Sequence, residues 1–208
     1  MKKKAVFFDA NILYSWHLNH LLMFFCETGV GLIEPYWSEL VVNEAVSNIL
    51  KNTGDDVSER FEKMNIAYPY ANIIDFEGLE DVPDVHSNDQ HVAKAAIFNE
   101  CDFLVTNNLK HFKFSSELQN KPKVVTPDTL LTAFAKKDPE KSFRATVLAW
   151  WHSVDDFSFD EYLHFLGRTE EGLKLLNFAA CLNTHIQSLE LTPHVAANSV
   201  TEHEKKRY

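Results

Sequence analysis

The chain of 208 residues carries 30 acidic and 20 basic side chains, a net charge of -10, and 45% of its residues are hydrophobic. This length suits one large domain, or one ordinary domain with an appendage, and allows a substantial core. The acidic balance argues against a protein that mainly coats nucleic acid, because such proteins need basic surfaces to neutralise phosphates. Three scattered cysteines, Cys26, Cys101 and Cys181, predict reduced thiols in a cytoplasm rather than a disulfide framework or a zinc cluster.

The sequence predicts neither a signal peptide nor a membrane span. Asp9 and Asn11 cut the N-terminal apolar run short, and no other segment approaches the length that a span requires. The acidity lies mostly in residues 1–135, which carry 19 acidic and 11 basic side chains, whereas residues 136–208 carry 11 and 9. A metal-binding pocket would contribute such an excess, as would a well-solvated surface.

The first predicted strand, residues 4–8, is a short apolar run that leads directly into Asp9-Ala10-Asn11. Such a run is typical of a buried strand, and in an open parallel sheet ligands bind at the carboxyl ends of the strands. We therefore interpret Asp9 as the first of several acidic groups that hold a divalent metal.

Strand and helix patterns alternate along the next hundred residues. Ser38 should cap one helix, a capping box of Ser87 with Gln90 should open another, and Pro35 should break a strand. We expect strands at residues 4–8, 31–36, 73–74, 103–106 and 124–125, and helices at residues 14–27, 39–50, 59–65, 88–97 and 127–134. This alternation predicts a parallel α/β sheet with right-handed crossovers.

Four polar residues should fall at one edge of that sheet. Parallel strands bring Asp9 and Asn108 to the same edge, where Asp89 joins them from the start of the intervening helix and Glu44 from the helix flank. Each also has an ordinary structural explanation. Asp9 and Asn108 are common turn residues, Asp89 suits a first helical turn, and a helical glutamate usually reaches solvent. Their shared edge is what favours a site.

Several segments together resemble PIN-domain ribonucleases, most closely the branch of VapC-type toxins from bacterial toxin–antitoxin pairs. The segments, in the order of that family, are residues 7–11, 37–44, 89–92, 95–96, 105–112 and 124–134. The resemblance implies a three-layer α/β/α nuclease domain with a central parallel sheet at residues 1–135, followed by a helical C-terminal extension at residues 136–208.

The resemblance also implies a role for each matching residue. The catalytic set would be Asp9, Glu44, Asp89 and Asn108, with Thr106, Asn11 and Ser38 in support. Asp9 and Asp89 would bind Mg²⁺ or Mn²⁺, which prefer oxygen ligands, and Glu44 and Asp84 are further candidate ligands. Two features depart from the family pattern. The loop at residues 84–89 is longer, and Asn108 carries no charge, so the site would depend on three carboxylates.

The implied reaction is metal-assisted hydrolysis of RNA phosphodiester bonds by a cytoplasmic endoribonuclease. Its partners would be the RNA substrate, a cognate antitoxin protein and a second copy of the chain in a homodimer. Lys110, His111 and Lys113, beside Phe112 and Phe114, form a basic-aromatic strip that we expect to touch RNA, although such charges are also common on a solvated face.

Two other functions are compatible with an aspartate after the first strand. Phosphatases with an aspartyl nucleophile share that feature, but they expect a second aspartate two residues later, where this chain has Asn11. A non-catalytic binding module would keep the fold and lose the chemistry. His86 and His91 invite a zinc interpretation, but they stand five residues apart without a clear third partner.

The sequence after Phe134 has a different character. Residues 135–141 predict a linker, and helices are expected at residues 143–151, 158–166 and 169–182, the last two capped by Ser158 and Thr169. Their large apolar residues must pack on the main domain or on another copy, or line a groove for a partner. The polar tail at residues 192–208 is expected to be mobile.

Overall fold

A computed structural model describes residues 2–27, 30–153, 157–170 and 172–205, and the chain divides into two compact units. The sheet unit consists of the residues up to Asn19 and of Ile33–Thr126. The helical unit consists of His20–Leu32 and of the residues from Pro127 onward. Helix α2 (Trp16–Cys26) contributes residues to both.

Five parallel strands form the sheet, in the order β3-β2-β1-β4-β5, which confirms the predicted α/β class. Val6, Phe7 and Phe8 of the central strand are fully buried. A parallel strand covered on both faces requires such an uninterrupted apolar run. The strands are β1 (Lys4–Phe8), β2 (Ile33–Ser38), β3 (Asn72–Ile73), β4 (Phe103–Val105) and β5 (Lys123–Val125).

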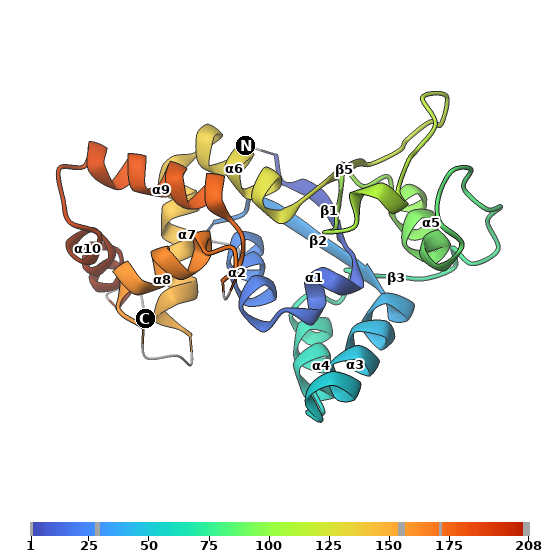
Figure 1. The fold of residues 1–208 in the computed structure, drawn as a ribbon, viewed down its shortest axis with the longest axis horizontal. Helices are drawn as coiled ribbons and strands as arrows, with labels where there is room; N and C mark the ends of the chain where they lie inside the picture. Colours follow the sequence, from blue (N-terminus) through green and yellow to red (C-terminus); the bar gives the residue numbers. More distant parts are fainter. Residues whose placement is uncertain (1, 28–29, 154–156, 171, 206–208) are drawn as a thin grey trace. The chain divides into compact units, whose positions relative to one another are not determined.

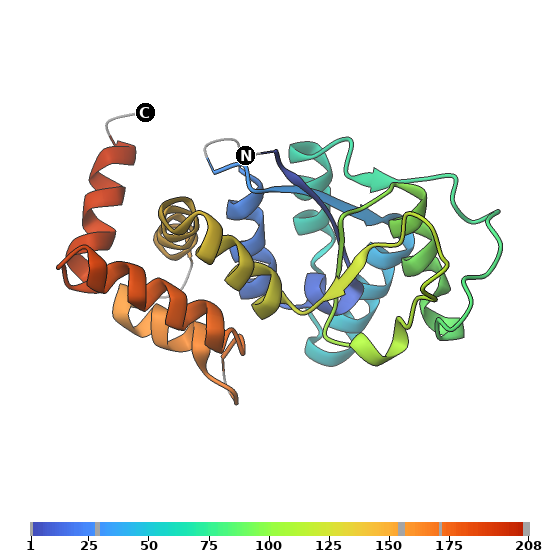
Figure 2. The same cartoon turned by 90° about the horizontal axis from the view of Figure 1, so that it is seen from above.

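Helices cover both faces of the sheet and complete the three layers (Figure 1, Figure 2). Helices α1 (Ala10–Tyr14), α3 (Glu39–Thr53) and α4 (Ser58–Ala67) belong to the connections that run from β1 through β2 to β3. Helix α5 (Gln90–Phe98) belongs to the connection that returns from β3 to β4. Because such crossovers are right-handed, opposite directions along the sheet place helices on opposite faces.

Pro35 lies inside β2 and does not break it, contrary to the prediction. The N–H of Trp37 donates to the carbonyl oxygen of Ala71, 2.9 Å away. The backbone hydrogen-bonding groups of alternate residues point to the same side of a strand, so the nitrogen of Pro35 also points toward the β3 side. Strand β3 begins only at Asn72, opposite Trp37. The missing N–H of proline therefore falls where β3 has not yet begun, and no ladder hydrogen bond is lost.

The helix expected at residues 14–27 is α2, Trp16–Cys26, and the structure adds a short helix, α1, before it. Helix α1 starts directly after Asp9, which is its N-cap, and Ser15 is extended between α1 and α2. The predicted N-cap role of Ser38 is confirmed, because its hydroxyl accepts from the N–H of Val41 at 3.4 Å. Helix α3 continues past Leu50 to Thr53 and ends at Gly54, whose φ of 81° suits glycine.

The expected linker at residues 135–141 is wrong. Helix α6 (Pro127–Lys137) runs through the predicted domain boundary at residue 135, and α7 (Pro139–Trp151) starts after Asp138, which caps it. Apolar side chains of α6 explain its place in the helical unit. Phe134 packs against Phe25 of α2, with ring centroids 6.3 Å apart, so α6 belongs with the helical unit rather than with the sheet.

The remaining helices partly match the prediction. Ser158 caps α8 (Phe159–Gly167), as expected, and forms a capping box with Glu161. Thr169 does not open a helix, and α9 spans Leu176–Ser188. Before α9 the chain folds back onto α8, and an added Cβ at Gly172 would lie 2.2 Å from the carbonyl oxygen of Phe165. This close approach competes with helix formation after Thr169.

The tail expected to be mobile forms α10 (Pro193–Lys205) within the described residues. Ala196 and Ala197 are buried, and the buried carboxylate of Glu204 pairs with Arg144 of α7 at 2.8 Å. Residues 206–208 lie outside the described part of the chain. The polar composition misled the prediction because the partner of Glu204 is sixty positions away in the sequence.

Two expectations concern the whole chain. Cys26, Cys101 and Cys181 are free thiols, and burial raises the pKa of the Cys101 thiol to about 12. None of the helices in the described parts of the chain is both long and apolar enough to span a membrane.

Replacing Gly172 by alanine should lower the thermal unfolding temperature, because the added methyl group would meet a backbone carbonyl that cannot move independently. The expected loss is about 1–3 kcal/mol, the usual cost of overpacking. Gly78→Ala is the matched control, since its added Cβ meets nothing within 4 Å. Equal unfolding temperatures for the two variants would contradict the packing described around α8 and α9.

Candidate functional site

The ends of β1 and β4 meet where the strand order changes direction. From β1 the chain moves through β2 to β3, whereas from β4 it moves the other way to β5. The N–H of Asp9, just past β1, donates to the carbonyl oxygen of Val105 in β4 at 3.2 Å. Such a switch point opens a crevice at the carboxyl ends of the strands, where ligands of open α/β sheets bind.

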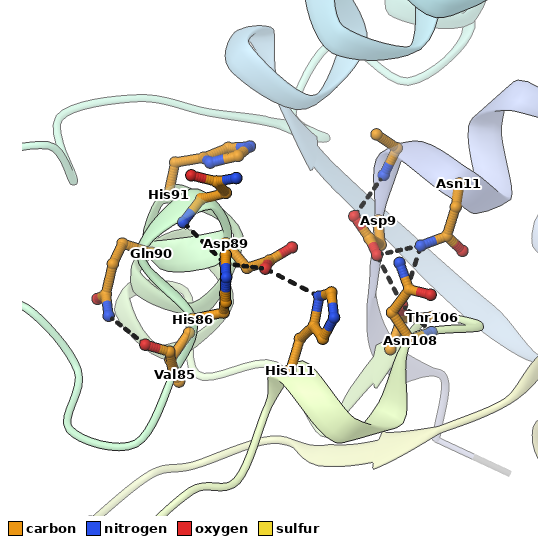
Figure 3. Close-up of polar contacts among 12 residues, drawn as sticks. Asp9, Asn11, Val85, His86, Asp89, Gln90, His91, Thr106, Asn108 and His111 are labelled. Atoms are coloured by element: carbon orange, nitrogen blue, oxygen red, sulfur yellow. Dashed lines mark hydrogen bonds and ion pairs between the residues drawn. The ribbon is translucent and has the colours of Figure 1, made fainter.

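Asp9 is buried, with 4% of its surface exposed, and both of its carboxylate oxygens accept hydrogen bonds. Oδ1 accepts from the N–H of Ala10 at 2.7 Å, and Oδ2 accepts from the hydroxyl of Thr106 at 2.6 Å and from the amide of Asn11. Figure 3 shows this group beside the end of β1. These bonds stabilise the carboxylate, so Asp9 has the capping role that a post-strand aspartate commonly has.

Asn11 and Thr106 join the two strand ends to each other. The amide of Asn11 donates to Thr106 Oγ1 at 3.0 Å, and its oxygen accepts from the N–H of Asn107 at the same distance. Thr106 Oγ1 also accepts from the N–H of Asn108 at 2.9 Å. The supporting positions expected for Asn11 and Thr106 therefore lie against Asp9, and they fix the turn that carries Asn108.

A pocket of about 320 Å³ opens beside Asp9. It contains all four side chains that the sequence placed at one sheet edge, from four separate segments of the chain. The residues that line it are Asp9, Ala10, Asn11, Tyr14, Glu44, Asn48, Asn52, Asp89 and Asn108. The expected convergence of these residues in space is present, whereas their catalytic roles remain predictions.

Asp89 lies beside two histidines. It ends the short 3₁₀ helix Ser87–Asp89 that precedes α5, and its Oδ2 lies 3.1 Å from Nδ1 of His111 and 3.4 Å from Nδ1 of His86. The two imidazole rings stack, with centroids 5.2 Å apart (Figure 3). The sequence interpretation missed this arrangement, since it assigned His111 to the basic-aromatic strip and considered His86 only with His91.

The predicted capping box at residues 87–90 is wrong. His86, not Ser87, is the N-cap of the 3₁₀ helix, and its Nδ1 accepts from the N–H of Asn88 at 3.3 Å. The side chain of Gln90 accepts from the N–H of Val82 and donates to the carbonyl oxygens of Val82 and Val85, at 2.7–3.0 Å. The Gln90 side chain thus fixes the preceding loop rather than capping the helix, because it forms three hydrogen bonds to the loop backbone and would form only one in a capping box.

Glu44 lies on the side of α3 that faces α5, half exposed, with 48% of its side-chain surface accessible. Its Oε2 stands 3.5 Å from Nε2 of His91, an electrostatic contact rather than a well-formed hydrogen bond. The orienting or packing role expected for His91 is consistent with this position. Each of the three carboxylates therefore has a polar neighbour, and none of these neighbours is a lysine or an arginine.

The negative charges act on one another. Burial and the charge of Asp89 raise the pKa of Asp9, although the hydrogen bonds from Thr106 and Ala10 favour its ionised form. Burial and the charge of Asp9 likewise raise the pKa of Glu44, although His91 opposes this effect. The carboxylates therefore lie close enough to repel one another, and a cation in the pocket would relieve that repulsion.

The donor set suits a hard divalent cation, since carboxylate and amide oxygens are the ligands that Mg²⁺ and Mn²⁺ prefer. A finished coordination cage is not observed. In residues 2–27, 30–153, 157–170 and 172–205, no group of three histidine, cysteine, aspartate or glutamate side chains stands ready to hold a metal ion. Such a cation would keep several waters, which suits a wide carboxylate pocket.

Other predicted site residues lie outside the pocket lining. Asp84 is exposed, with a positive φ of 63°, and is not among the lining residues. Ser38 is buried and acts as the cap of α3. Lys110 and Lys113 are exposed on the segment that follows Asn108. The structure thus brings Asp9, Glu44, Asp89 and Asn108 together and leaves these four other residues outside the pocket lining.

The sequence interpretation missed three pocket residues, Tyr14, Asn48 and Asn52. A signal for two of them was available. Asn48 and Asn52 follow Glu44 at intervals of four, so they share one face of α3. The signal was lost because the predicted helix ended at Leu50, one turn before its actual end.

Comparisons with known proteins found no matching family model, no matching curated protein and no matching solved structure. The likeness to PIN-domain ribonucleases therefore remains a resemblance in sequence segments, alongside a fold of the expected class.

Replacing Glu44 by glutamine should raise the unfolding temperature at pH 7 in the presence of a chelator. Folding raises the pKa of Glu44, so the protonated side chain fits the folded state better than the ionised one does. Its contribution to the free energy of unfolding is therefore full below the unfolded pKa of about 4.3, where the side chain is protonated, and is lost as pH rises through the folded pKa. Glutamine cannot ionise and avoids this loss. The variant should gain less than about 1 kcal/mol at pH 7, since the side chain is half exposed, and nothing below about pH 4.

Glu62→Gln, at an exposed position of α4, is the control for this experiment. It should show no gain between pH 4 and pH 7. The same gain in both variants, or a gain for Glu44→Gln that does not change with pH, would contradict repulsion within the pocket.

Proposed function

We propose that the protein is a metal-dependent endoribonuclease that hydrolyses RNA phosphodiester bonds with Mg²⁺ or Mn²⁺. The observation that carries the proposal is the meeting of Asp9, Glu44 and Asp89 in one pocket at the sheet switch point. Burial raises the pKa values of two of these carboxylates, Asp9 and Glu44, and the neighbouring negative charges raise them further. The resemblance to PIN-domain ribonucleases supplies the reaction class.

Asp9 and Asp89 would hold the metal, with Glu44 and Asn108 at the edge of its ligand set. When bound, the metal would lower the pKa of a water, orient it and offset charge on the phosphate. Hydrogen bonds from Thr106 and Asn11 keep the Asp9 carboxylate in a fixed orientation. Glu44 would accept a proton from an attacking water, since its carboxylate lines the same pocket.

His111 positions Asp89 through one carboxylate oxygen, Oδ2, and His86, whose Nδ1 accepts from the N–H of Asn88, stacks on the His111 ring. Figure 3 shows the Asp89 side chain, just before α5, extending toward the strand ends that carry Asp9 and Asn108. Orientation of a metal ligand by an outer partner is a common way to raise its effectiveness. We therefore assign these histidines a positioning role.

The charge of the pocket argues against the phosphatase alternative. Among the described residues that line it, none is a lysine or arginine that could bind a phosphate directly. Asn11 occupies the position where such enzymes need a second aspartate, and its amide donates to Asp9 rather than exchanging a proton. Phosphate binding would then depend on the metal, with Lys110 and Lys113 contacting RNA nearby.

The resemblance extends the proposal to biological context. We propose a cytoplasmic toxin of a type II toxin–antitoxin pair, with a cognate antitoxin and a homodimeric state as expected partners. The net charge of -10 would suit a basic antitoxin segment. Growth arrest on overexpression that disappears in an Asp9 variant would support the toxin role, whereas equal growth of both strains would contradict it.

Incubating the purified full chain with end-labelled RNA, in Mn²⁺ or in a chelator, tests the reaction class. Metal-dependent internal cuts support the nuclease. Release of phosphate from a small phosphate ester, without RNA cleavage, would favour the phosphatase. RNA binding without turnover in Mn²⁺ would favour a non-catalytic module.

Asp9→Asn should reduce kcat/KM for RNA by more than about 100-fold, because a metal ligand usually contributes at least as much as its outer partners. Asp84→Asn is the matched control, since Asp84 is exposed outside the pocket and asparagine tolerates its positive φ. Circular dichroism should show that both variants fold. Full activity of Asp9→Asn would refute the assignment.

A second measurement does not depend on activity. Mn²⁺ should raise the unfolding temperature of the natural protein and of Asp84→Asn by mass action, but not that of Asp9→Asn or Asp89→Asn. An identical rise in all four proteins would mean that the cation binds elsewhere.

A further inference from the structure

One end of the pocket is neutral. Tyr14, the last residue of α1, faces Asn48 and Asn52 of α3, and the amide of Asn52 donates to the Tyr14 hydroxyl at 3.4 Å. These three side chains carry no charge at neutral pH and offer an aromatic ring, two amides and a hydroxyl. The opposite end holds the carboxylates of Asp9, Glu44 and Asp89. The pocket therefore combines an anionic end with a neutral hydrogen-bonding end.

This division limits what the neutral end can bind. A phosphate beside three carboxylates is unfavourable unless a cation lies between them, so the phosphate belongs at the anionic end with the metal. A neutral group with both donors and acceptors can occupy the other end. Asparagine amides pair with the edges of nucleobases, and an aromatic ring provides a face for stacking.

A partly buried guanidinium fixes the end of α1 that carries Tyr14. Arg60 of α4 donates to the backbone oxygen of Leu13 and lies over the rings of Trp16 and Phe61, 5.6 and 4.6 Å from their centroids. Burial lowers the pKa of Arg60 to about 10, so it stays charged at neutral pH. Tyr14 is thus held in place before any ligand arrives, which reduces the entropy cost of binding.

We propose that Tyr14, Asn48 and Asn52 form a nucleobase subsite that receives the base next to the cleaved phosphodiester. The inference rests on the proposed ribonuclease function and adds the residues that set its base preference. The long Asn52–Tyr14 contact is near the limit for a hydrogen bond, so a base can replace it at small cost. Because the base must leave its stack to enter, the substrate segment must be unpaired.

Variants of the full chain test the subsite. Tyr14→Ala and Asn52→Ala should each raise KM for single-stranded RNA roughly 5- to 100-fold, the range for loss of one stacked base, with kcat changed little. They should also change which bases flank the cut sites in a random-sequence RNA. Tyr14→Phe should keep most of the affinity, because it retains the ring. Asn43→Ala, exposed on α3 outside the pocket lining, is the matched control.

Binding is measured separately by fluorescence anisotropy of a dye-labelled single-stranded RNA in Ca²⁺. Weaker binding of Tyr14→Ala and Asn52→Ala, but not of Asn43→Ala, supports the subsite even if the natural protein cleaves nothing, in which case only the nuclease proposal fails. Metal-dependent cleavage with unchanged KM and base preference in both variants overturns the subsite and leaves the nuclease. Cleavage of fully paired RNA at the same rate as single-stranded RNA also overturns the subsite. Absence of both RNA binding and cleavage overturns both proposals.

Discussion

The parallel pairing of β1 with β4 is the constraint on which the candidate site depends. It sets the N–H of Asp9 against the carbonyl oxygen of Val105 and brings the hydroxyl of Thr106 to the Asp9 carboxylate at 2.6 Å. A buried carboxylate is costly unless hydrogen bonds satisfy it. A shift of β4 by one residue would turn Thr106 to the other face and leave Asp9 without its strongest donor. The strand register and the polar site therefore stabilise each other.

The partners of the three carboxylates fix their positions without cancelling their charge. Asp9 receives hydroxyl and amide donors, Asp89 contacts two imidazoles, and Glu44 stands beside a third. A lysine or arginine in these places would neutralise the pocket with a permanent positive charge. Burial raises the pKa values of Asp9 and Glu44, and the folded state adds to this effect by holding negative charges together that the unfolded chain would separate. A cation in such a pocket would relieve this repulsion.

Sequence patterns predicted the features that depend on near neighbours. The apolar run of β1, the caps formed by Ser38 and Ser158, and the edge shared by Asp9 and Asn108 all follow from local composition and from the rules of parallel sheets. The errors arose where a distant partner decides the outcome. Gln90 bonds to the loop at Val82, Gly172 lies against Phe165, and Glu204 pairs with Arg144. A local signal cannot weigh such competitors, because they become neighbours only in the folded chain.

The actual length of α3 decides what the pocket can recognise. The helix runs one turn beyond the predicted end and stops at Gly54, and that extra turn carries Asn52 to the pocket. Glu44 and Asn52 are eight residues apart on one rigid helix, so their Cα atoms are separated by roughly 12 Å along its axis. A small ion cannot contact both ends of the pocket at once. Under the proposed function, a ligand that does so would be an extended molecule with a metal-bound phosphate near Glu44 and a neutral planar group near Asn52, which is the arrangement of a nucleotide within a chain.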